Sequence, residues 1–165
     1  MNKESSVPKL KSLYADNPEA KSKNSLRAWL YLMKCAKRIE QEMSGRLRVD
    51  YKSSMSRFDV LAHLYFAGPK GLSTSHLAKL LLTSKGNITR LLDRKVQDGL
   101  LERKANARDR RISEVFLSDA GTALFERMAP DHESWSDEMF GILSDKEINE
   151  LVRMLRSVHH ELEAQ

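Results

Sequence analysis

Apolar residues recur at helical spacing through the first third of the chain, after an opening stretch that has no such periodicity. Residues 1–16 predict an arm without a packed face. A long helix is expected to follow, starting either at Asn17-Pro18 or at Asn24-Ser25, and to continue to about Leu47. Its apolar positions form a stripe wider than one packing partner needs, which predicts contacts with its own domain and with a second chain. The positions are Leu26, Trp29, Leu30, Met33 and Ala36, and Leu32, Cys35, Ile39 and Met43.

The middle of the chain repeats short helical patterns separated by turn signals. The segment "SRFDVLAHLYFAG" predicts a helix that ends at the following Gly-Pro pair. Ser73 or Thr74 is expected to cap a short helix, and Thr83 or Ser84 a further one that stops at Gly99. The inward residues are expected to be Phe58, Leu61, Leu64 and Tyr65 in the first, Leu77, Leu80 and Leu81 in the second, and Ile88, Leu91, Leu92 and Val96 in the third.

Two alternating segments, "LLERKA" and "ISEVFLS", then predict a β-hairpin around a charged loop, with Val115 and Leu117 on one face. Ser118 is expected to cap a helix that runs to about Leu143, and "SDKE" at 144–147 is a capping box for a last helix. The inward residues of that last helix are expected to be Ile148, Leu151, Leu155 and Val158.

This order of elements predicts a mainly α protein with a small β-hairpin, in which a winged helix-turn-helix is joined to a helical dimerisation module. The domains are expected to be a flexible N-terminal arm (1–16), an N-terminal dimerisation helix region (17–52), the DNA-binding domain (53–118) and C-terminal dimerisation helices (119–165).

The charge distribution supports a polyanionic partner. The net charge is +5 for the whole chain, but residues 83–111 alone carry +5 and residues 119–165 carry −7. A basic middle beside an acidic tail is typical of a protein with one surface that meets nucleic acid. The alternative is a solvated surface with uneven charge.

Several classes of protein are disfavoured by what the sequence lacks. There is no signal-like or membrane-spanning run, and a single cysteine fits a reducing compartment, so we expect a cytoplasmic protein without membrane association. The histidines show no metal-ligand spacing, and no catalytic motif is present. The sequence therefore predicts a protein that is not an enzyme and has no catalytic residues, metal site or cofactor.

The helix predicted after Ser84 has one face suited to DNA. On a helical wheel, Gly86, Asn87, Arg90 and Arg94 lie opposite the apolar positions, and Ser84 and Lys85 lie at the N-terminal end. Asn pairs bidentately with adenine and Arg with guanine in a major groove. An ordinary amphipathic helix with a solvated face is the alternative.

The charged loop carries a family resemblance. "DRRISEVFLS" follows the pattern D-x-R-x-x-x-V-x-L-[TS], and "DAG" comes next. With "LTSKGNITRLLDRKVQDGLLERKANARDRR", it resembles the recognition helix and wing of the MarR family of regulators, over about residues 25–160. The resemblance implies a homodimer with interleaved terminal helices, bound to a pseudo-palindromic operator in double-stranded DNA. It implies DNA contacts from Ser84, Lys85, Asn87, Thr89 and Arg90, and a minor-groove arginine at Arg111 or Arg110 that Asp109 orients.

A narrower resemblance concerns the effector. "WLYLMKCAKRIEQEMSGRLRVDYKSSMSRFDVLAHL", "TSKGNIT" and "MAPDHESW" resemble a branch that controls aromatic-acid catabolism and responds to hydroxycinnamates, benzoates or their CoA thioesters. Met55-Ser56 and Lys85-Gly86 depart from that branch. We expect a homodimeric, ligand-responsive repressor. The family resemblance implies a ligand pocket where the first, second and fifth helices meet near the dimer interface. The candidate lining residues are Trp29, Met33, Arg38, Met55, Phe58, His63, Met128 and His132, and Arg46, Arg48 and Arg57 are further candidates to hold a carboxylate or phosphate.

Two other functions remain open. Cys35, among basic residues, is a candidate redox sensor, although its apolar neighbours favour a buried inert thiol. An effector-independent architectural DNA-binding protein is the second alternative.

Overall fold

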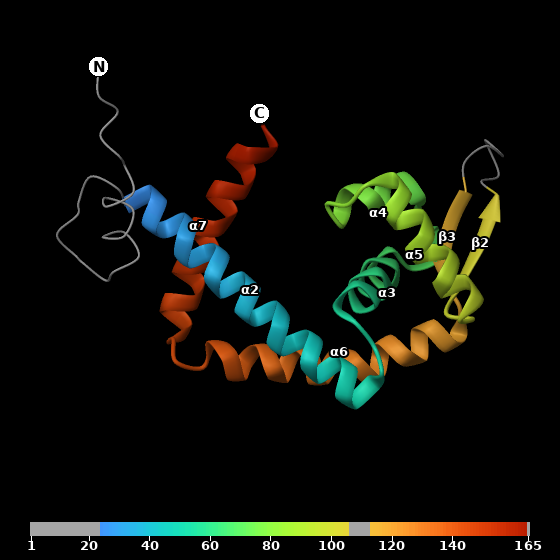
Figure 1. Ribbon diagram of the computed structural model, residues 1–165, viewed down its shortest axis with the longest axis horizontal. Helices are drawn as coiled ribbons and strands as arrows, with labels where there is room; N and C mark the ends of the chain where they lie inside the picture. Colours follow the sequence, from blue (N-terminus) through green and yellow to red (C-terminus); the bar gives the residue numbers. More distant parts are fainter. Residues whose placement is uncertain (1–23, 106–112, 165) are drawn as a thin grey trace, which may run out of the picture. The chain divides into compact units, whose positions relative to one another are not determined.

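The computed structural model describes residues 24–105 and 113–164, apart from the side chain of Lys85, and it is mainly helical (Figure 1). The helices are α2 (Asn24–Tyr51), α3 (Met55–Ala67), the 3-10 turn η2 (Gly68–Lys70), α4 (Thr74–Leu80), α5 (Lys85–Gln97), α6 (Asp119–Phe140) and α7 (Asp145–Glu163). The strands are β1 (Leu72–Ser73), β2 (Leu101–Ala105) and β3 (Ser113–Leu117). The predicted fold class is confirmed, and the predicted arm (1–16) lies outside the described residues.

The strands form an antiparallel sheet in the order β1-β3-β2. The predicted hairpin pairs Leu101 with Leu117 and Ala105 with Ser113. The third strand, β1, pairs Leu72 with Val115 and was not predicted, because two residues are too few to show an alternating pattern.

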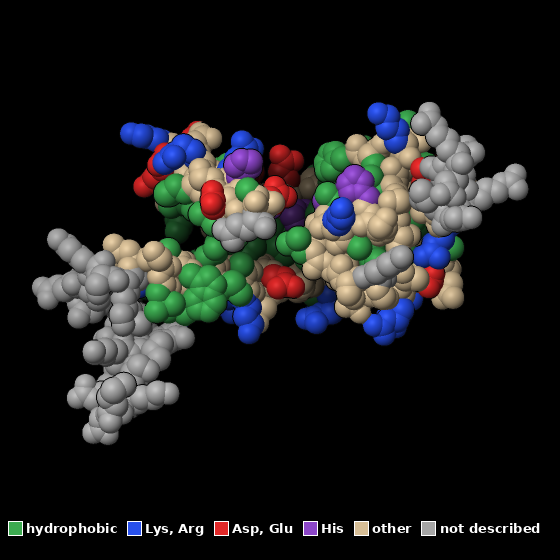
Figure 2. Space-filling view, turned by 90° about the horizontal axis from the view of Figure 1, so that it is seen from above, with side chains coloured by type: hydrophobic (Ala, Val, Ile, Leu, Met, Phe, Trp, Pro, Cys, Tyr) green, Lys and Arg blue, Asp and Glu red, His purple; other side chains and the backbone are tan. Residues whose placement is uncertain are grey.

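The chain divides into two compact units. The first ends at Glu42 and the second begins at Met43. The described part of the first unit is the N-terminal portion of α2. Trp29, Leu32 and Met33 are exposed there, and Figure 2 shows that hydrophobic side chains reach the surface of the described residues. The described helix opens at Asn24 and ends four residues later than predicted; the alternative start at Asn17 lies outside the described residues.

The second unit contains the hydrophobic core. Its buried residues come from the end of α2, from α3, α4, α5 and α6, and from the sheet: Leu47, Phe58, Val60, Leu61, Leu64, Leu77, Ala78, Ile88, Leu92, Leu101, Val115, Phe125 and Met128. Full burial of an aliphatic side chain of this size stabilises a fold by about 1.5–3 kcal/mol relative to exposure. These residues hold α5 and the sheet as one body.

Serine caps begin most helices of the second unit. The side chains of Ser73, Ser84 and Ser118 accept hydrogen bonds from the backbone N–H groups of the first turns of α4, α5 and α6. Ser144 and Glu147 form the capping box of α7. The predicted start signals of these helices are therefore confirmed, and they determine where α5 begins.

Some predictions of inward positions were wrong. Tyr65 is exposed, because its hydroxyl donates to Glu126 Oε1 at 3.1 Å while its ring lies against Phe125. Leu80 is also exposed, since α4 ends there after two turns. On α3, Val60 is fully buried, although it was not predicted to be.

The last two helices, α6 and α7, differ most from the prediction. α6 ends at Phe140 rather than at about Leu143, and α7 buries none of its side chains in the single chain. Leu155 and Val158, predicted to point inward, are exposed together with Val152 and Leu162. Among the described helices, none is both long and apolar enough to cross a membrane.

Candidate nucleic-acid interface

Helix α5 has two chemically different faces. Ile88 and Leu92 are fully buried in the core, while Asn87, Arg90 and Arg94 are exposed. Ser84 fixes the start of the helix by accepting from the N–H of Asn87 at 3.3 Å. The hydroxyl proton of Ser84 is still available to a phosphate oxygen, because capping uses only the oxygen as an acceptor. Because the apolar face is buried, the hydrogen-bond donors of the opposite face point outward.

The exposed face of α5 borders a hollow of about 400 Å³. Apart from Ser56 and Thr83, all its lining residues belong to α5: Asn87, Ile88, Arg90, Leu91 and Arg94. Two guanidinium groups and no carboxylate contribute to this lining. Such a surface attracts an anion, since arginine donates to phosphate oxygens in a bidentate manner.

Arg90 and Asn87 contact each other within this face. Arg90 Nη2 donates to Asn87 Oδ1 at 2.7 Å, across one turn of α5. This bond occupies one acceptor of the Asn87 amide and restricts the rotamers of the arginine. Thr89 is partly exposed and also interacts within the protein. Lys85 opens the helix, and its side chain lies outside the described residues.

The wing is attached to the same body by its strands. Val115 is fully buried, and Arg103 of β2 forms an ion pair with Asp93 of α5 at 2.7 Å. The predicted wing residues Asp109, Arg110 and Arg111 lie outside the described residues. The structure therefore describes the base of the wing and its connection to α5.

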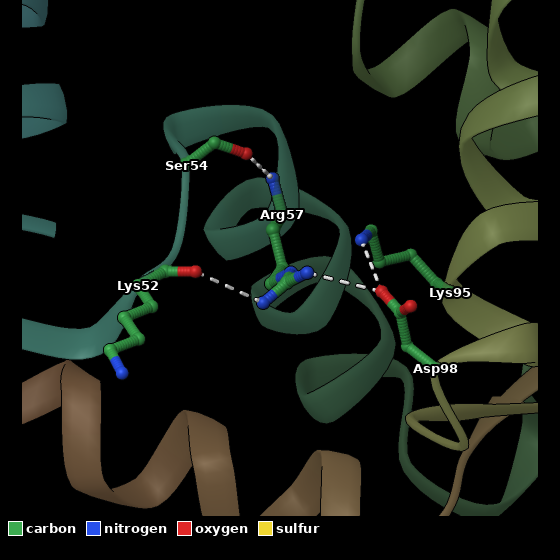
Figure 3. Close-up of polar contacts among 5 residues, drawn as sticks. All are labelled: Lys52, Ser54, Arg57, Lys95 and Asp98. Carbon is green, nitrogen blue, oxygen red and sulfur yellow. Dashed lines mark hydrogen bonds and ion pairs between the residues drawn. The ribbon is translucent and has the colours of Figure 1, made fainter. Parts of the chain in front are cut away.

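A polar network that the sequence did not predict lies at the C-terminal end of α5 (Figure 3). Asp98 Oδ2 accepts from Lys95 Nζ at 2.7 Å and from Arg57 Nη2 at 3.1 Å. The hydrogen bond from Lys95 and the charges of both cations hold the pKa of Asp98 below its ordinary value. Arg57 was a candidate to bind an effector, but its guanidinium group is engaged here. Arg57 and Asp98 are 41 residues apart, and no spacing rule connects residues at that separation.

The candidate effector residues are divided between the two units. In the second unit, the His132 ring stacks on Phe58 with centroids 4.1 Å apart, and Met55 packs against the core. His63 is half-buried, while Met128 is completely enclosed in the core. Trp29, Met33 and Arg38 belong to the first unit and are exposed.

Burial leaves His132 in an unusual state. Its Nε2 atom is buried and has no hydrogen-bond partner. Burial also lowers the pKa of the imidazole below its ordinary value, because the charged form loses hydration. The lowered pKa favours the neutral imidazole, and its Nε2 atom is a buried polar group without a partner.

Neighbouring residues that sequence reasoning missed are Tyr51 and Trp135. The Tyr51 hydroxyl donates to Asp131 and the ring lies 6.4 Å from that of Trp135. Arg46, a candidate effector contact, instead pairs with Glu138 and lies over the Trp135 ring. Aromatic residues spread over two helices leave no local signal of their proximity.

The interpretation of Cys35 as a buried thiol was wrong for the single chain. Cys35 is exposed. Apolar neighbours in the sequence do not by themselves show that a side chain on a helix is buried.

Comparison with known proteins connects this geometry to a family. The MarR family model matches residues 54–112. The chain is 29% identical over 137 residues to the transcriptional regulator MhqR of Bacillus subtilis, covering 83% of this chain and 92% of MhqR. It is 33% identical over 113 residues to the regulator PecS of Dickeya dadantii, covering 68% of each. The transcriptional repressor YetL of Bacillus subtilis is 32% identical over 109 residues, 66% of this chain and 65% of YetL.

The fold is also that of solved regulators. The structure of Sco3205, a MarR family regulator from Streptomyces coelicolor in complex with DNA, superposes with a TM-score of 0.78 at 21% identity. The match covers 89% of this chain and 92% of Sco3205. At this identity the likeness concerns the fold alone.

Proposed function

Since the chain belongs to the MarR family of DNA-binding transcriptional regulators, we propose that it acts as a homodimeric repressor that a small aromatic acid or its CoA thioester releases from a pseudo-palindromic operator. The observation that carries this proposal is the two-faced α5. Buried Ile88 and Leu92 anchor the helix, while Asn87, Arg90 and Arg94 present donors around an anion-attracting hollow. We infer a cytoplasmic protein, because a regulator of this kind shares a compartment with chromosomal DNA.

The proposed DNA contacts divide by chemistry. Asn87, Arg90 and Arg94 suit base edges and phosphates of a major groove, with Ser84, Lys85 and Thr89 beside them. In the wing, Arg111 or Arg110 is proposed to enter the minor groove, oriented by Asp109, because a narrow minor groove has an enhanced negative potential.

Dimerisation is supported by the uncovered apolar side chains. Val152, Leu155, Val158 and Leu162 recur on α7 at helical spacing, and Trp29 and Met33 are exposed on α2. A second copy of the chain would remove these surfaces from water. It would also present a second α5 about 34–36 Å from the first, which is one turn of DNA.

Repression and release are both explained by a dimer in which two DNA-binding α5 helices are joined at a fixed distance. YetL, one of the similar proteins, is a repressor by its name. A dimer that occupies an operator excludes other proteins from the same DNA. An effector that prefers a dimer with a different distance between the two α5 helices lowers operator affinity. The size of the effect is set by the difference in the effector's affinity for the DNA-binding dimer and for the other dimer conformation.

The stacked rings of His132 and Phe58 support an aromatic effector. An aromatic acid combines an apolar ring with a polar group, which matches the paired rings and the unpartnered Nε2 of His132. The exposed Cys35 supports a second candidate function, release by oxidation, because accessible thiols react with peroxide more readily than buried ones.

The test is a binding assay with the DNA upstream of the chain's own gene and a shuffled duplex of equal composition. The proposal predicts preference for the upstream DNA, and its loss upon addition of benzoate, 4-hydroxycinnamate or their CoA thioesters, but not octanoate or free CoA. Equal affinity for both duplexes would indicate an architectural protein. Release by peroxide that the Cys35→Ser variant abolishes, with no response to the acids, would favour the redox function.

A further inference from the structure

The network around Asp98 connects the two ends of a path from α2 to α5. Arg57 Nη2 donates to Asp98 Oδ2 at 3.1 Å, and Arg57 Nη1 donates to the carbonyl oxygen of Lys52 at 3.4 Å (Figure 3). Lys52 follows directly after α2 and has a left-handed backbone, with φ of 49°. Asp98 is the C-cap of α5. One guanidinium group therefore spans from the end of α2 to the end of the helix that carries the DNA-binding residues.

The position of Asp98 is unfavourable without these cations. A carboxylate at the C-terminal end of a helix meets the negative end of the helix dipole. Lys95 and Arg57 compensate by pairing with the same oxygen, and the side chain of Lys95 is only 8% exposed. An aspartate is thus present where the helix alone disfavours it, and the interactions with Lys95 and Arg57 compensate for its placement.

The backbone at this end of α5 is fixed by local bonds. Gly99 has φ of 72° and its N–H donates to Val96, while the N–H of Leu100 donates to Lys95. This is the Schellman arrangement of a helix C-terminus. Local bonds set the shape of the helix end, but they do not set the direction of α5 relative to α3. The Arg57–Asp98 pair does act between those two elements.

We infer that Arg57 and Asp98 are positioning residues for DNA recognition, which hold α5 at the angle that its base-reading side chains require. The inference rests on the proposed function. Neither residue needs to touch DNA for this role. Because Arg57 also holds the carbonyl of Lys52, a change at the end of α2 is transmitted to α5 through the same guanidinium group.

The role is separable from stability. In an Arg57→Ala variant, Lys95 still pairs with Asp98, so no buried charge is left alone and the fold is retained. In an Arg57→Lys variant, the charge remains, but a single compact ammonium group lacks the planar fork that reaches Lys52 and Asp98 together. Arg46→Ala is a matched control, since it removes one positive charge and one ion pair, with Glu138, away from α5.

The experiment measures affinity for a duplex that the wild-type protein selects from a random pool, and for a shuffled duplex at the same salt concentration. Arg57→Ala and Arg57→Lys are expected to lower the ratio of the two affinities about tenfold. Affinity for the shuffled duplex and its salt dependence are expected to match those of Arg46→Ala. Adding Asp98→Asn to Arg57→Ala is expected to lower the ratio little further, since the pair acts as one unit.

Three results would overturn the inference: an unchanged ratio in either Arg57 variant, an equal loss in the Arg46→Ala control, or a salt slope smaller by about one, which indicates a direct phosphate contact. If the wild-type protein selects no duplex, the proposed function fails. If it does select one and the Arg57 variants retain the preference, only the positioning role fails.

Discussion

Arg90 donates a hydrogen bond from Nη2 to Oδ1 of Asn87 at 2.7 Å on the exposed face of α5. In this arrangement Asn87 orients the arginine and has less acceptor capacity for adenine, because one lone pair of the amide oxygen is occupied. The pair therefore suits guanine read by Arg90 more than two independent base contacts.

Arg90→Ala is expected to weaken operator binding by about 1–3 kcal/mol, or roughly tenfold to a hundredfold, because a bidentate base contact is lost. Asn87→Ala is expected to relax the preference for guanine at the same position, measured by selection from randomised duplexes. Arg153→Ala, whose ion pair with Glu150 lies on α7, is the control. If the Asn87 variant keeps the preference for guanine at that position and changes the preference at another position, Asn87 contacts a base by itself. That result would contradict this division of roles.

Arg111→Ala is expected to weaken operator binding about tenfold or more, because minor-groove insertion contributes both charge and fit. Its melting temperature and dimerisation are expected to stay near those of the wild type. Fluorescence anisotropy with the selected duplex measures the effect. Unaltered affinity would exclude Arg111 as the minor-groove residue, and the same assay on Arg110→Ala would then test its neighbour.

Gly121→Ala is expected to destabilise the protein by about 1–3 kcal/mol, because the chain must shift to admit the added carbon. A Cβ atom at this position would lie 2.1 Å from the carbonyl oxygen of Leu100 and 3.2 Å from Leu117 Cδ2. Thermal unfolding measures the change. Gly86→Ala is the control, since its Cβ would meet nothing within 4 Å, and no loss of stability is expected there. An equally stable Gly121 variant would show that α6 does not need this close approach.

Acidification is expected to destabilise the folded chain through His132. Burial holds its pKa below the unfolded value of about 6.5, so the unfolded state binds the proton more tightly. The stabilisation is complete above pH about 7 and is lost as pH falls from there through the folded pKa. Urea unfolding between pH about 7.5 and 5 measures this slope. His132→Phe retains the stack on Phe58 without a titrating group, and a slope as steep as that of the wild type would contradict the assignment.

Local features of the fold could be predicted from the sequence. Ser84 and Ser118 are predicted caps because a hydroxyl before a helix satisfies free N–H groups, and both act in this way. The opposition of Ile88 and Arg90 follows from helical periodicity alone. The helix that carries the candidate interface, and its orientation, were therefore predictable.

Contacts across the fold could not be predicted. Arg57 and Asp98 meet only because α3 and the end of α5 are brought together by the core, and no local pattern records this. Tyr65 was assigned to the core by periodicity, but the hydrogen bond of its hydroxyl with Glu126 keeps it at the surface. For α7, periodicity identified an apolar face correctly but did not tell what covers it.

Sequence-specific DNA binding is tested most directly by the affinity of the wild-type protein for its selected duplex and for a shuffled duplex over a range of salt concentrations. The selected duplex is expected to bind at least about a thousandfold more tightly than the shuffled duplex at physiological salt, while affinity for both falls steeply as salt rises. Equal affinity for the two duplexes at every salt concentration would contradict the claim that α5 and the wing read a DNA sequence.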